Sequence, residues 1–511
     1  MQEDLKELEQ TFRAYLQARY GLRGEGPLND FISRRDGTLM FADIDLEALV
    51  AEHGAPLEIA FCPLITEQIN QMNQAAQQAQ DRTRYAGSFI YAYATKANFS
   101  EEVVRTALNA GAHYETSSVA DVRIATDLWR RGTLSSDRYV FCNGSKEDDY
   151  IQAILRFRLA GNRNVVPVLD DLDEWDAYRA SPVVMGIGVR AREYAKCSGG
   201  DRFGLLPDEI DQVIETMAGT PHQLTLYHAM VGSQLEDQAA WLQNLEGAVE
   251  AYCELRRRVP TLHMFSFGGG MPTSAYDLGF QFDYAGFLAA LFETIAATCA
   301  RYDVPVPDVI GEFGRYTVAN HSMYLIEVGK VKRGRDGDAP WYLLNGSLMV
   351  SAPDTLIVDD QQFIILPLDG WDDPAQEVRL GGRRTCDSDD QYPRPGAEPL
   401  VLPETNGGQI IAVFGIGAYQ SMLGGKGGAH HCLNPEMKRV VIEQDGDHLV
   451  THVIEQQGLA QIMTALGYGN ETQPARVRRS PAPRMRKPDL WRTMVRAHSQ
   501  RRDQAQLALT N

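Results

Sequence analysis

The stretch Phe89-Ile-Tyr-Ala-Tyr-Ala-Thr-Lys-Ala-Asn98 decides how the rest of the chain is interpreted. Residues 89–95 are β-branched, aromatic or small, which favours a buried strand over a helix. The run ends at Lys96, its only charged residue. Partial burial at a strand end lowers the pKa of an ammonium and leaves a neutral amine that can attack an aldehyde. Lys96 is therefore a candidate for Schiff-base chemistry, and the open alternative is an ordinary solvated lysine.

Short apolar runs of this kind recur along the chain and alternate with amphipathic segments. The predicted strands are 89–95, 112–117, 138–142, 165–169, 183–190, 223–229, 262–267 and 308–312, and predicted helices between them include 101–110, 119–131, 148–160, 208–218, 237–257 and 284–302. Alternation predicts a parallel sheet, and eight units over roughly 250 residues fit a closed (β/α)8 barrel. An open doubly wound sheet would need a nucleotide-binding glycine turn after the first strand, which residues 96–100 lack.

After residue 320 the pattern changes to strand-like runs without long helices between them. These runs are 322–329, 341–344, 362–366, 409–415, 438–443 and 449–454, and they indicate a mostly β second domain. We expect an N-terminal segment (1–56) that partly joins the β domain, the barrel (57–320), the β domain (321–468) and a basic tail (469–511). Residues Leu57-Glu-Ile-Ala-Phe61 could start the barrel or join the β domain.

The composition is that of a globular protein that can bury a large core. The chain has 511 residues with 44% hydrophobic content, and no apolar stretch is long enough to span a bilayer. The opening Met1-Gln-Glu-Asp-Leu-Lys6 is acidic where a signal peptide would be basic, so we expect a cytoplasmic location and no membrane partner. The seven cysteines include no C-x-x-C pair, which predicts reduced thiols and no metal site.

The net charge of -19 is unevenly distributed along the chain. From Glu471 onward there are ten Lys or Arg against three acids. We interpret this tail as a solvated extension that lies on the acidic body of its own or a neighbouring subunit, and we expect no nucleic-acid partner.

Polar residues and glycines gather at the predicted carboxyl ends of the strands, where barrels place their chemistry. They are Lys96, Glu115, Ser117, Ser118, Asn143, Asp170, Arg190, 228–233, 268–270 and 312–315. Gly268-Gly-Gly270 lets backbone N–H groups approach a phosphate, and Gly314 lies in the next loop along the barrel. This set suits an anionic, phosphate-bearing cofactor with an aldehyde.

Glu312 is the residue that indicates a reaction class. A carboxylate beside a pyridine nitrogen keeps that nitrogen protonated, so the ring can accept electrons released from Cα. The alternative is an ion pair between Glu312 and Arg315 at the end of a strand.

Together these motifs resemble the fold-type III pyridoxal 5'-phosphate (PLP)-dependent decarboxylases, which include diaminopimelate, ornithine and biosynthetic arginine decarboxylases. The resemblance covers most of residues 40–465, and the arginine decarboxylase branch is most similar. Its motifs are Tyr93-Ala-Thr-Lys-Ala-Asn98, Gly232-Ser-Gln234, Gly268-Gly-Gly270, Gly311-Glu-Phe-Gly-Arg315, Thr385-Cys-Asp-Ser-Asp389 and Gly417-Ala-Tyr419, with Phe141-Cys-Asn-Gly144, Asn345-Gly-Ser-Leu348, Ser351-Ala-Pro-Asp354 and Pro367-Leu368 typical of that branch. It implies a TIM-like barrel with a β domain, and a homodimer in which each active site borrows residues from the partner.

The resemblance also implies roles for individual residues. Lys96 would form the Schiff base with PLP, and Glu312 would contact the pyridine nitrogen. Cys386, entering from the partner subunit, would protonate Cα after CO2 leaves, and Asp387 would bind the distal cationic group of the substrate. The implied cofactor-binding set is completed by Ser233, Gly269, Gly270, Gly314, Arg315 and Tyr419, to which we add Arg190 from its strand end.

The chain departs from the family pattern at two positions that bear on these roles. Met230 stands where relatives place a histidine that stacks on the cofactor ring, and His228 lies two residues earlier on the same predicted strand face. We include both in the cofactor-binding set. Asn345 stands where relatives often have an acid contacting the distal amine of the substrate, so it is a substrate-binding candidate.

The predicted function is PLP-dependent decarboxylation of an amino acid with a polar or cationic side chain, such as arginine, ornithine, lysine or diaminopimelate. Decarboxylation of this kind belongs to amino-acid metabolism and polyamine biosynthesis. The alternatives are an amino-acid racemase of the same fold and a catalytically degenerate PLP-binding protein. Which amino acid, and which enantiomer, stays open.

Overall fold

The computed structural model describes residues 10–194, 202–358, 361–383 and 390–468. Eight parallel strands close into a barrel in the order β10-β11-β12-β13-β6-β7-β8-β9. These strands are β6 (Phe89–Ala94), β7 (His113–Thr116), β8 (Val140–Cys142), β9 (Val165–Leu169), β10 (Gly186–Ala191), β11 (Gln223–Ala229), β12 (Met264–Gly268) and β13 (Asp308–Phe313). Each overlaps one predicted strand, and the predicted (β/α)8 barrel with a second, mostly β part is confirmed.

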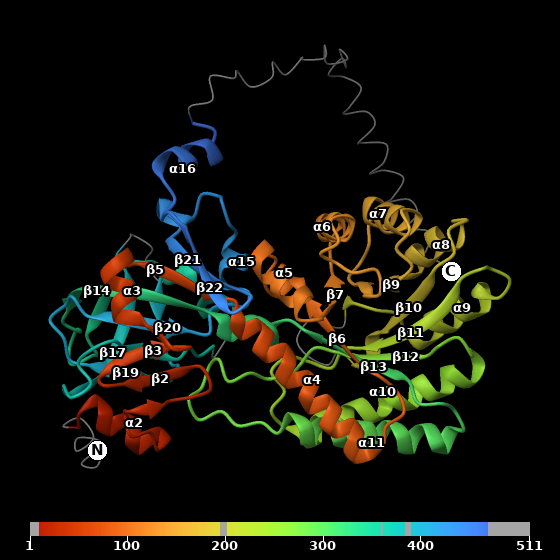
Figure 1. The fold of residues 1–511 in the computed structure, drawn as a ribbon, viewed down its shortest axis with the longest axis horizontal. Coiled ribbons are helices and arrows are strands. Elements are labelled where there is room, and N and C mark those ends of the chain that lie inside the picture. The colour runs from red at the N-terminus through yellow and green to blue at the C-terminus, as the bar shows by residue number, and fades with distance from the viewer. Residues whose placement is uncertain (1–9, 195–201, 359–360, 384–389, 469–511) are drawn as a thin grey trace, which may run out of the picture. The chain divides into compact units, whose positions relative to one another are not determined.

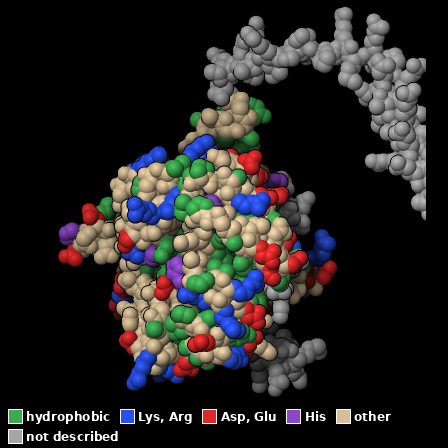
Figure 2. Space-filling view, turned by 90° about the vertical axis from the view of Figure 1, so that its right-hand side faces the viewer, with side chains coloured by type: hydrophobic (Ala, Val, Ile, Leu, Met, Phe, Trp, Pro, Cys, Tyr) green, Lys and Arg blue, Asp and Glu red, His purple; other side chains and the backbone are tan. Residues whose placement is uncertain are grey.

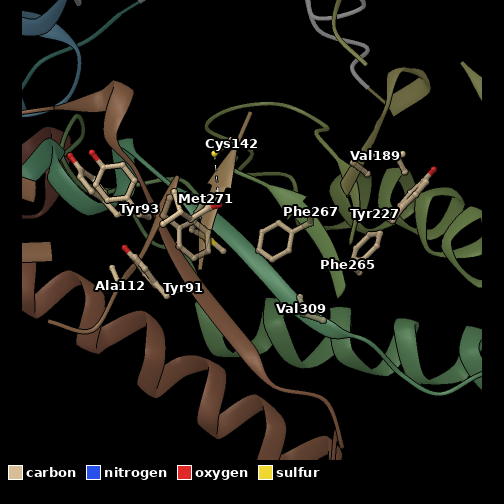
Figure 3. Close-up of a cluster of buried hydrophobic side chains, with 14 of the residues drawn as sticks. Tyr91, Tyr93, Ala112, Cys142, Val189, Tyr227, Phe265, Phe267, Met271 and Val309 are labelled. Atoms are coloured by element: carbon tan, nitrogen blue, oxygen red, sulfur yellow. Dashed lines mark hydrogen bonds between the residues drawn. The ribbon is translucent and has the colours of Figure 1, made fainter. Parts of the chain in front are cut away.

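The sequence of β6 forms a strand because both of its faces are buried. Ile90 and Ala92 belong to the cluster of apolar side chains that fills the barrel. Tyr91 and Tyr93 point the other way, into the layer between the strands and the surrounding helices. Figure 3 shows part of this outer layer, with Tyr91 and Tyr93 on the side of the strands that faces the helices. A strand buried on both faces has no polar alternation, as in residues 89–94.

Helices cover the outside of the barrel (Figure 1). They are α4 (Pro63–Thr83), α5 (Glu101–Asn109), α6 (Val119–Arg130), α7 (Asp148–Leu159), α8 (Leu172–Arg179), α9 (Pro207–Met217), α10 (Gln238–Arg258), α11 (Tyr284–Tyr302) and the short α12 (Arg315–Val318). Short 3-10 turns add η1 (Thr95–Ala97), η2 (Arg192–Tyr194) and η4 (Ala319–His321). The six predicted helices are present within a residue or two. The short α8 was not predicted; it starts where the Asp171 carboxylate accepts a hydrogen bond from Glu174 N.

The second domain is built around a large sheet with the order β18-β17-β15-β14-β5-β21-β22, to which β16, β19 and β20 also pair. Its strands are β5 (Leu57–Phe61), β14 (Ser322–Lys332), β15 (Trp341–Leu344), β16 (Ile365–Pro367), β17 (Ala375–Gly382), β18 (Gln391–Tyr392), β19 (Leu400–Pro403), β20 (Ile410–Phe414), β21 (Lys438–Asp445) and β22 (His448–Ile454). Short helices are α13 (Leu348–Ser351), α14 (Asp354–Ile357), α15 (Gln420–Gly424), η5 (His431–Leu433) and α16 (Leu459–Ala465).

Strand β5 belongs to this second sheet and not to the barrel. It pairs antiparallel with β14 and parallel with β21. The prediction that the barrel begins at residue 57 is therefore wrong for this strand, because its hydrogen-bond partners come from the C-terminal half. We propose that the barrel domain begins at α4 and that the other predicted domain limits stand.

The N-terminal segment packs on one face of the second sheet. It contains α2 (Phe12–Tyr20), a four-stranded sheet of β1 (Gly26–Pro27), β2 (Ile32–Arg35), β3 (Thr38–Phe41) and β4 (Ile44–Asp45), and then α3 (Leu46–His53). Phe12, Leu16 and Phe31 share one apolar cluster with Ile59 and Met323. The N-terminal segment therefore shields one face of the sheet from water.

No helix in the described part of the chain is long and apolar enough to cross a membrane. Within the same residues, no group of His, Cys, Asp or Glu has the arrangement of a metal site. Positive and negative side chains are interspersed on the face seen in Figure 2.

Candidate active site

The carboxyl ends of the barrel strands surround a cavity of about 700 Å³. Predicted site residues that line it are Lys96, Arg190, His228, Met230, Ser233, Gly269, Gly270, Glu312, Gly314, Arg315 and Tyr419. They come from the ends of five strands and from the start of α15, so residues far apart in the sequence meet in one place. Because ligand sites in barrels form at this end of the strands, the cavity is the candidate active site.

Lys96 lies in the turn η1 that follows β6, with a side chain 48% exposed toward the cavity. Its Nζ lies 3.4 Å from both carboxylate oxygens of Glu115. Burial acts to lower the pKa of Lys96, but the charges of Glu115, Tyr419 and Glu312 together raise it above its ordinary value. The predicted lowering of this pKa is therefore wrong, because a buried acid on the neighbouring strand stabilises the ammonium.

Glu312, at the end of β13, is buried and held by two donors. Ser266 Oγ donates to Oε1 at 2.8 Å, and Asn143 Nδ2 donates to Oε2 at 2.8 Å. Burial raises the pKa of Glu312, while Lys96 and the two hydrogen bonds act to lower it. The alternative of an ion pair between Glu312 and Arg315 is not formed: the guanidinium of Arg315 instead lies 3.4 Å from Asp354.

Arg315 and the glycines form one wall of the cavity. Arg315 Nη1 donates to Tyr276 Oη at 3.0 Å, and its guanidinium lies 4.8 Å from the ring centre of Tyr419. Its buried Nε has no hydrogen-bond partner among the described residues. Gly270 has φ +109°, a conformation that side chains rarely adopt. A Cβ on Gly314 would lie 2.9 Å from Ala97 Cβ. Only glycine fits at these two positions, which leaves backbone exposed to the cavity.

His228 and Met230 both reach the cavity, as the sequence suggested they could. The Gly269 N–H donates to Met230 Sδ at 3.3 Å, so the thioether packs on the triple glycine. Neither ring nitrogen of the buried His228 has a hydrogen-bond partner among the described residues, although Nδ1 lies 3.7 Å from Glu312 Oε1. Burial, with Arg190 and Lys96 nearby, lowers the pKa of His228 well below its usual range, so this imidazole is neutral.

Arg190 ends β10 with its Nε buried and without a partner among the described residues. Its guanidinium lies 5.1 Å from the ring centre of Phe203. Burial lowers the pKa of Arg190, but the side chain stays charged because an arginine titrates far above neutral pH. It contributes a fixed positive charge to the cavity wall.

Of the predicted substrate-binding residues, Asn345 is described by the structure and does not line this cavity. Asn345 bonds to Ala55 O at 3.1 Å and to Glu327, on the second sheet. Asp387 and the proposed proton donor Cys386 lie outside the described residues. Two residues at strand ends that received no role, Glu115 and Asn143, instead lie at the centre of the hydrogen-bond network. Their position at the end of a predicted strand was the signal that could have singled them out.

These groups fit pyridoxal 5'-phosphate. The cavity has the volume for a cofactor of this size, an amine that can react with an aldehyde, and an acid held ready for a ring nitrogen. An anion can be bound by the glycine wall and by Nε of Arg190 and Arg315, neither of which has a hydrogen-bond partner within the part of the chain that the structure describes. By fold and site, the protein is a barrel whose cavity suits a phosphorylated aldehyde and presents a lysine to it.

Comparison with known proteins gives the family. Residues 67–319 match the pyridoxal binding domain of the pyridoxal-dependent decarboxylases, which confirms the predicted resemblance to this family and the predicted cofactor. The chain is 28% identical to arginine decarboxylase 1 of Oryza sativa subsp. japonica, over 60% of this chain and 49% of that protein. It is 25% identical to a biosynthetic arginine decarboxylase of Xylella fastidiosa, over 56% and 48%. The chain thus matches about half the length of these relatives.

Solved structures confirm the fold. The biosynthetic arginine decarboxylase of Campylobacter jejuni has a TM-score of 0.75 at 20% identity, covering 89% of this chain and 90% of that one. Diaminopimelate decarboxylase from M. jannaschii, in complex with L-lysine, has a TM-score of 0.69 at 19% identity, covering 85% and 97%. Both similarities extend through the barrel and the second domain.

Proposed function

We propose that the protein is a PLP-dependent decarboxylase of an amino acid with a polar or cationic side chain. The observation that carries this proposal is that Lys96 and the buried Glu312 face one cavity. This pair suits the removal of CO2. The amine can bind the cofactor, and an acid beside the pyridine nitrogen keeps the ring a strong electron acceptor. The relatives named arginine decarboxylase support the same reaction.

The described residues that line the cavity would have separate roles in binding the cofactor. Ser233, Gly270 and Arg315 would hold the phosphate, and the Glu312 carboxylate would hold a proton at the ring nitrogen. When bound, PLP supplies an aldehyde that takes up amines and a ring that accepts the electrons of the breaking Cα–carboxylate bond. Met230 and His228 would pack beside the ring and keep water from it.

The remaining steps fall to residues of a second copy of the chain. We propose a homodimer in which Cys386 of one subunit returns a proton to Cα at the other subunit's site. Asp387 would then pair with the distal ammonium or guanidinium of the substrate. A role for Asn345 in substrate binding requires that it too enters from the neighbouring subunit, because within its own chain it faces Ala55 and Glu327.

The relatives indicate the substrate class. Proteins similar to this chain are named for arginine, diaminopimelate and lysine or ornithine as substrates. We propose a substrate of this kind, a cytoplasmic location, and a place in amino-acid or polyamine metabolism. The racemase alternative is not favoured, because racemases of this fold usually contact the pyridine nitrogen with arginine, whereas Glu312 lies in this cavity.

The test is to incubate the purified holoenzyme with L- and D-forms of these amino acids and to follow CO2 release and chirality. We expect CO2 and the corresponding amine. Lys96→Ala abolishes the reaction, whereas Lys330→Ala, at an exposed position on β14, leaves it unchanged. Stereoinversion without CO2 would instead identify a racemase, and PLP binding without turnover of any substrate would identify a degenerate protein.

A further inference from the structure

Asn143 links two buried acids, Glu312 in the cavity wall and Glu115 behind Lys96. Its Nδ2 donates to Glu115 Oε1 at 2.9 Å and to Glu312 Oε2 at 2.8 Å. Glu115 ends β7 and Glu312 ends β13, so one amide group joins strands on either side of β6. The orientation of the amide is set by its neighbours, because its oxygen in place of the nitrogen would repel both carboxylates.

Two buried carboxylates that share one donor favour taking up a proton. Burial is the largest cause that raises the pKa of each acid, and the charge of Glu312 raises the pKa of Glu115 further. A hydrogen bond to the charged form of an acid lowers its pKa, and Asn143 donates one such bond to each of the two carboxylates. Glu115 receives its other hydrogen bonds from Lys96, whose charge is altered when the amine reacts. Asn143 is thus the neutral donor that both acids share.

The surrounding structure holds Asn143 in place. Its backbone N–H donates to Thr116 O at 2.8 Å. The next turn is fixed by Lys146, whose Nζ donates to Gly144 O at 2.7 Å and to the Glu174 carboxylate at 2.9 Å. Asn143 Oδ1 is buried without a partner in the described structure. Among the described residues, the side-chain amide of Asn143 therefore makes only the two hydrogen bonds to the acids. Replacing the side chain removes those two bonds and no others in that part of the structure.

We propose that Asn143 is a positioning residue that keeps Glu312 in the cavity wall and the neighbouring buried Glu115 ionised together. This inference rests on the proposed function, since it concerns the acid that would partner the ring nitrogen. The other titratable or charged groups that face the pair are Lys96, Arg190 and His228 from the cavity, with Asp121, Tyr114, Cys142 and Tyr150 behind Glu115.

The experiment follows the absorption of bound PLP and its dissociation constant against pH in the holoenzyme. We expect Asn143→Ala to move the acid limb of both profiles upward by about one pH unit, because each carboxylate loses a charge-assisted hydrogen bond. Asn143→Asp should move it further in the same direction by adding a third acid. Ser266→Ala, which removes one donor from Glu312 alone, should give a smaller shift.

Asn320→Ala is the matched control, because Asn320 is equally buried and its amide bonds to Thr273 and Ser274. It should leave both profiles unchanged. If wild type shows no PLP absorption, the proposed function fails. If wild type binds PLP but Asn143→Ala has the wild-type acid limb, the role of Asn143 is overturned and the proposed function stands. Should Asn143→Ala fail to fold, the isosteric Asn143→Asp tests the same point: an acid limb at the wild-type pH would overturn the role of Asn143.

Discussion

Lys96 Nζ lies 3.4 Å from each carboxylate oxygen of Glu115, a fully buried acid at the end of the neighbouring strand. This contact raises the pKa of the candidate reactive amine. We therefore expect Glu115→Gln to lower the pKa of Lys96 by about one unit or more. In the protein without cofactor, Lys96 should then react faster with an aldehyde at neutral pH, measured as borohydride-trapped adduct by peptide mass spectrometry. An unchanged pH dependence at Lys96, with Lys330 as the reference lysine, would contradict this.

Glu312→Gln should separate cofactor binding from turnover. An amide cannot hold a positive charge at the ring nitrogen, so we expect CO2 release to fall on the order of 10²-fold. PLP binding should persist, because Arg315 and the glycine wall are unchanged. Steady-state rates together with the absorption of bound PLP measure the two effects, and a rate equal to wild type would remove Glu312 from the mechanism.

The ion pair between Lys146 and Glu174 is buried, with side chains 0% and 1% exposed. Lys146→Met leaves Glu174 without its partner, so we expect a loss of about 3–5 kcal/mol in the free energy of unfolding. The double change Lys146→Met with Glu174→Leu should recover much of this loss. Urea unfolding followed by circular dichroism measures it, and equal stability of the single and double variants would contradict the argument.

Acid should destabilise the fold through two histidines. Burial lowers the pKa of His321 to about 4, and burial with the charge of Arg138 lowers the pKa of His113 to about 4. Both pKa values lie below those in the unfolded chain, so the unfolded state binds more protons as pH falls from about 6.5 toward 4. Each histidine should therefore reduce stability by up to about 1.4 kcal/mol per pH unit in that window.

Thermal unfolding across this pH range checks the expectation. His113→Asn should flatten the pH dependence, whereas replacing the exposed His448 should not change it. A slope equal to wild type in His113→Asn would show that His113 does not contribute.

The barrel could be predicted from the sequence because its strands are short apolar runs buried on both faces, as in residues 89–94. The N-terminal sheet was missed because its strands, such as Gly26–Pro27 and Ile44–Asp45, are too short to produce a pattern. The sheet to which β5 belongs is set by its pairing with β14 and β21, which are far away in the sequence. A local sequence pattern could therefore not predict it.

The candidate site was predicted as a set of residues but not as a network. Lys96, Glu312 and the glycines were singled out by their chemistry at strand ends, and all reach one cavity. The contacts of Glu115 and Asn143 depend on which strands are neighbours and on their register, so the direction of the Lys96 pKa could not be worked out from residues 89–98. Family motifs placed Asn345 in the site, whereas within its own chain it lies on the second sheet.

The placement of β5 has a consequence for how the protein is made on the ribosome. Glu58 on β5 and Arg439 on β21 form an ion pair across 381 residues of sequence. Residues 57–61 are synthesised before any barrel strand, yet both strands that flank β5 emerge only after the last barrel strand. During translation this apolar segment therefore has neither of its pairing strands until the whole barrel has been synthesised.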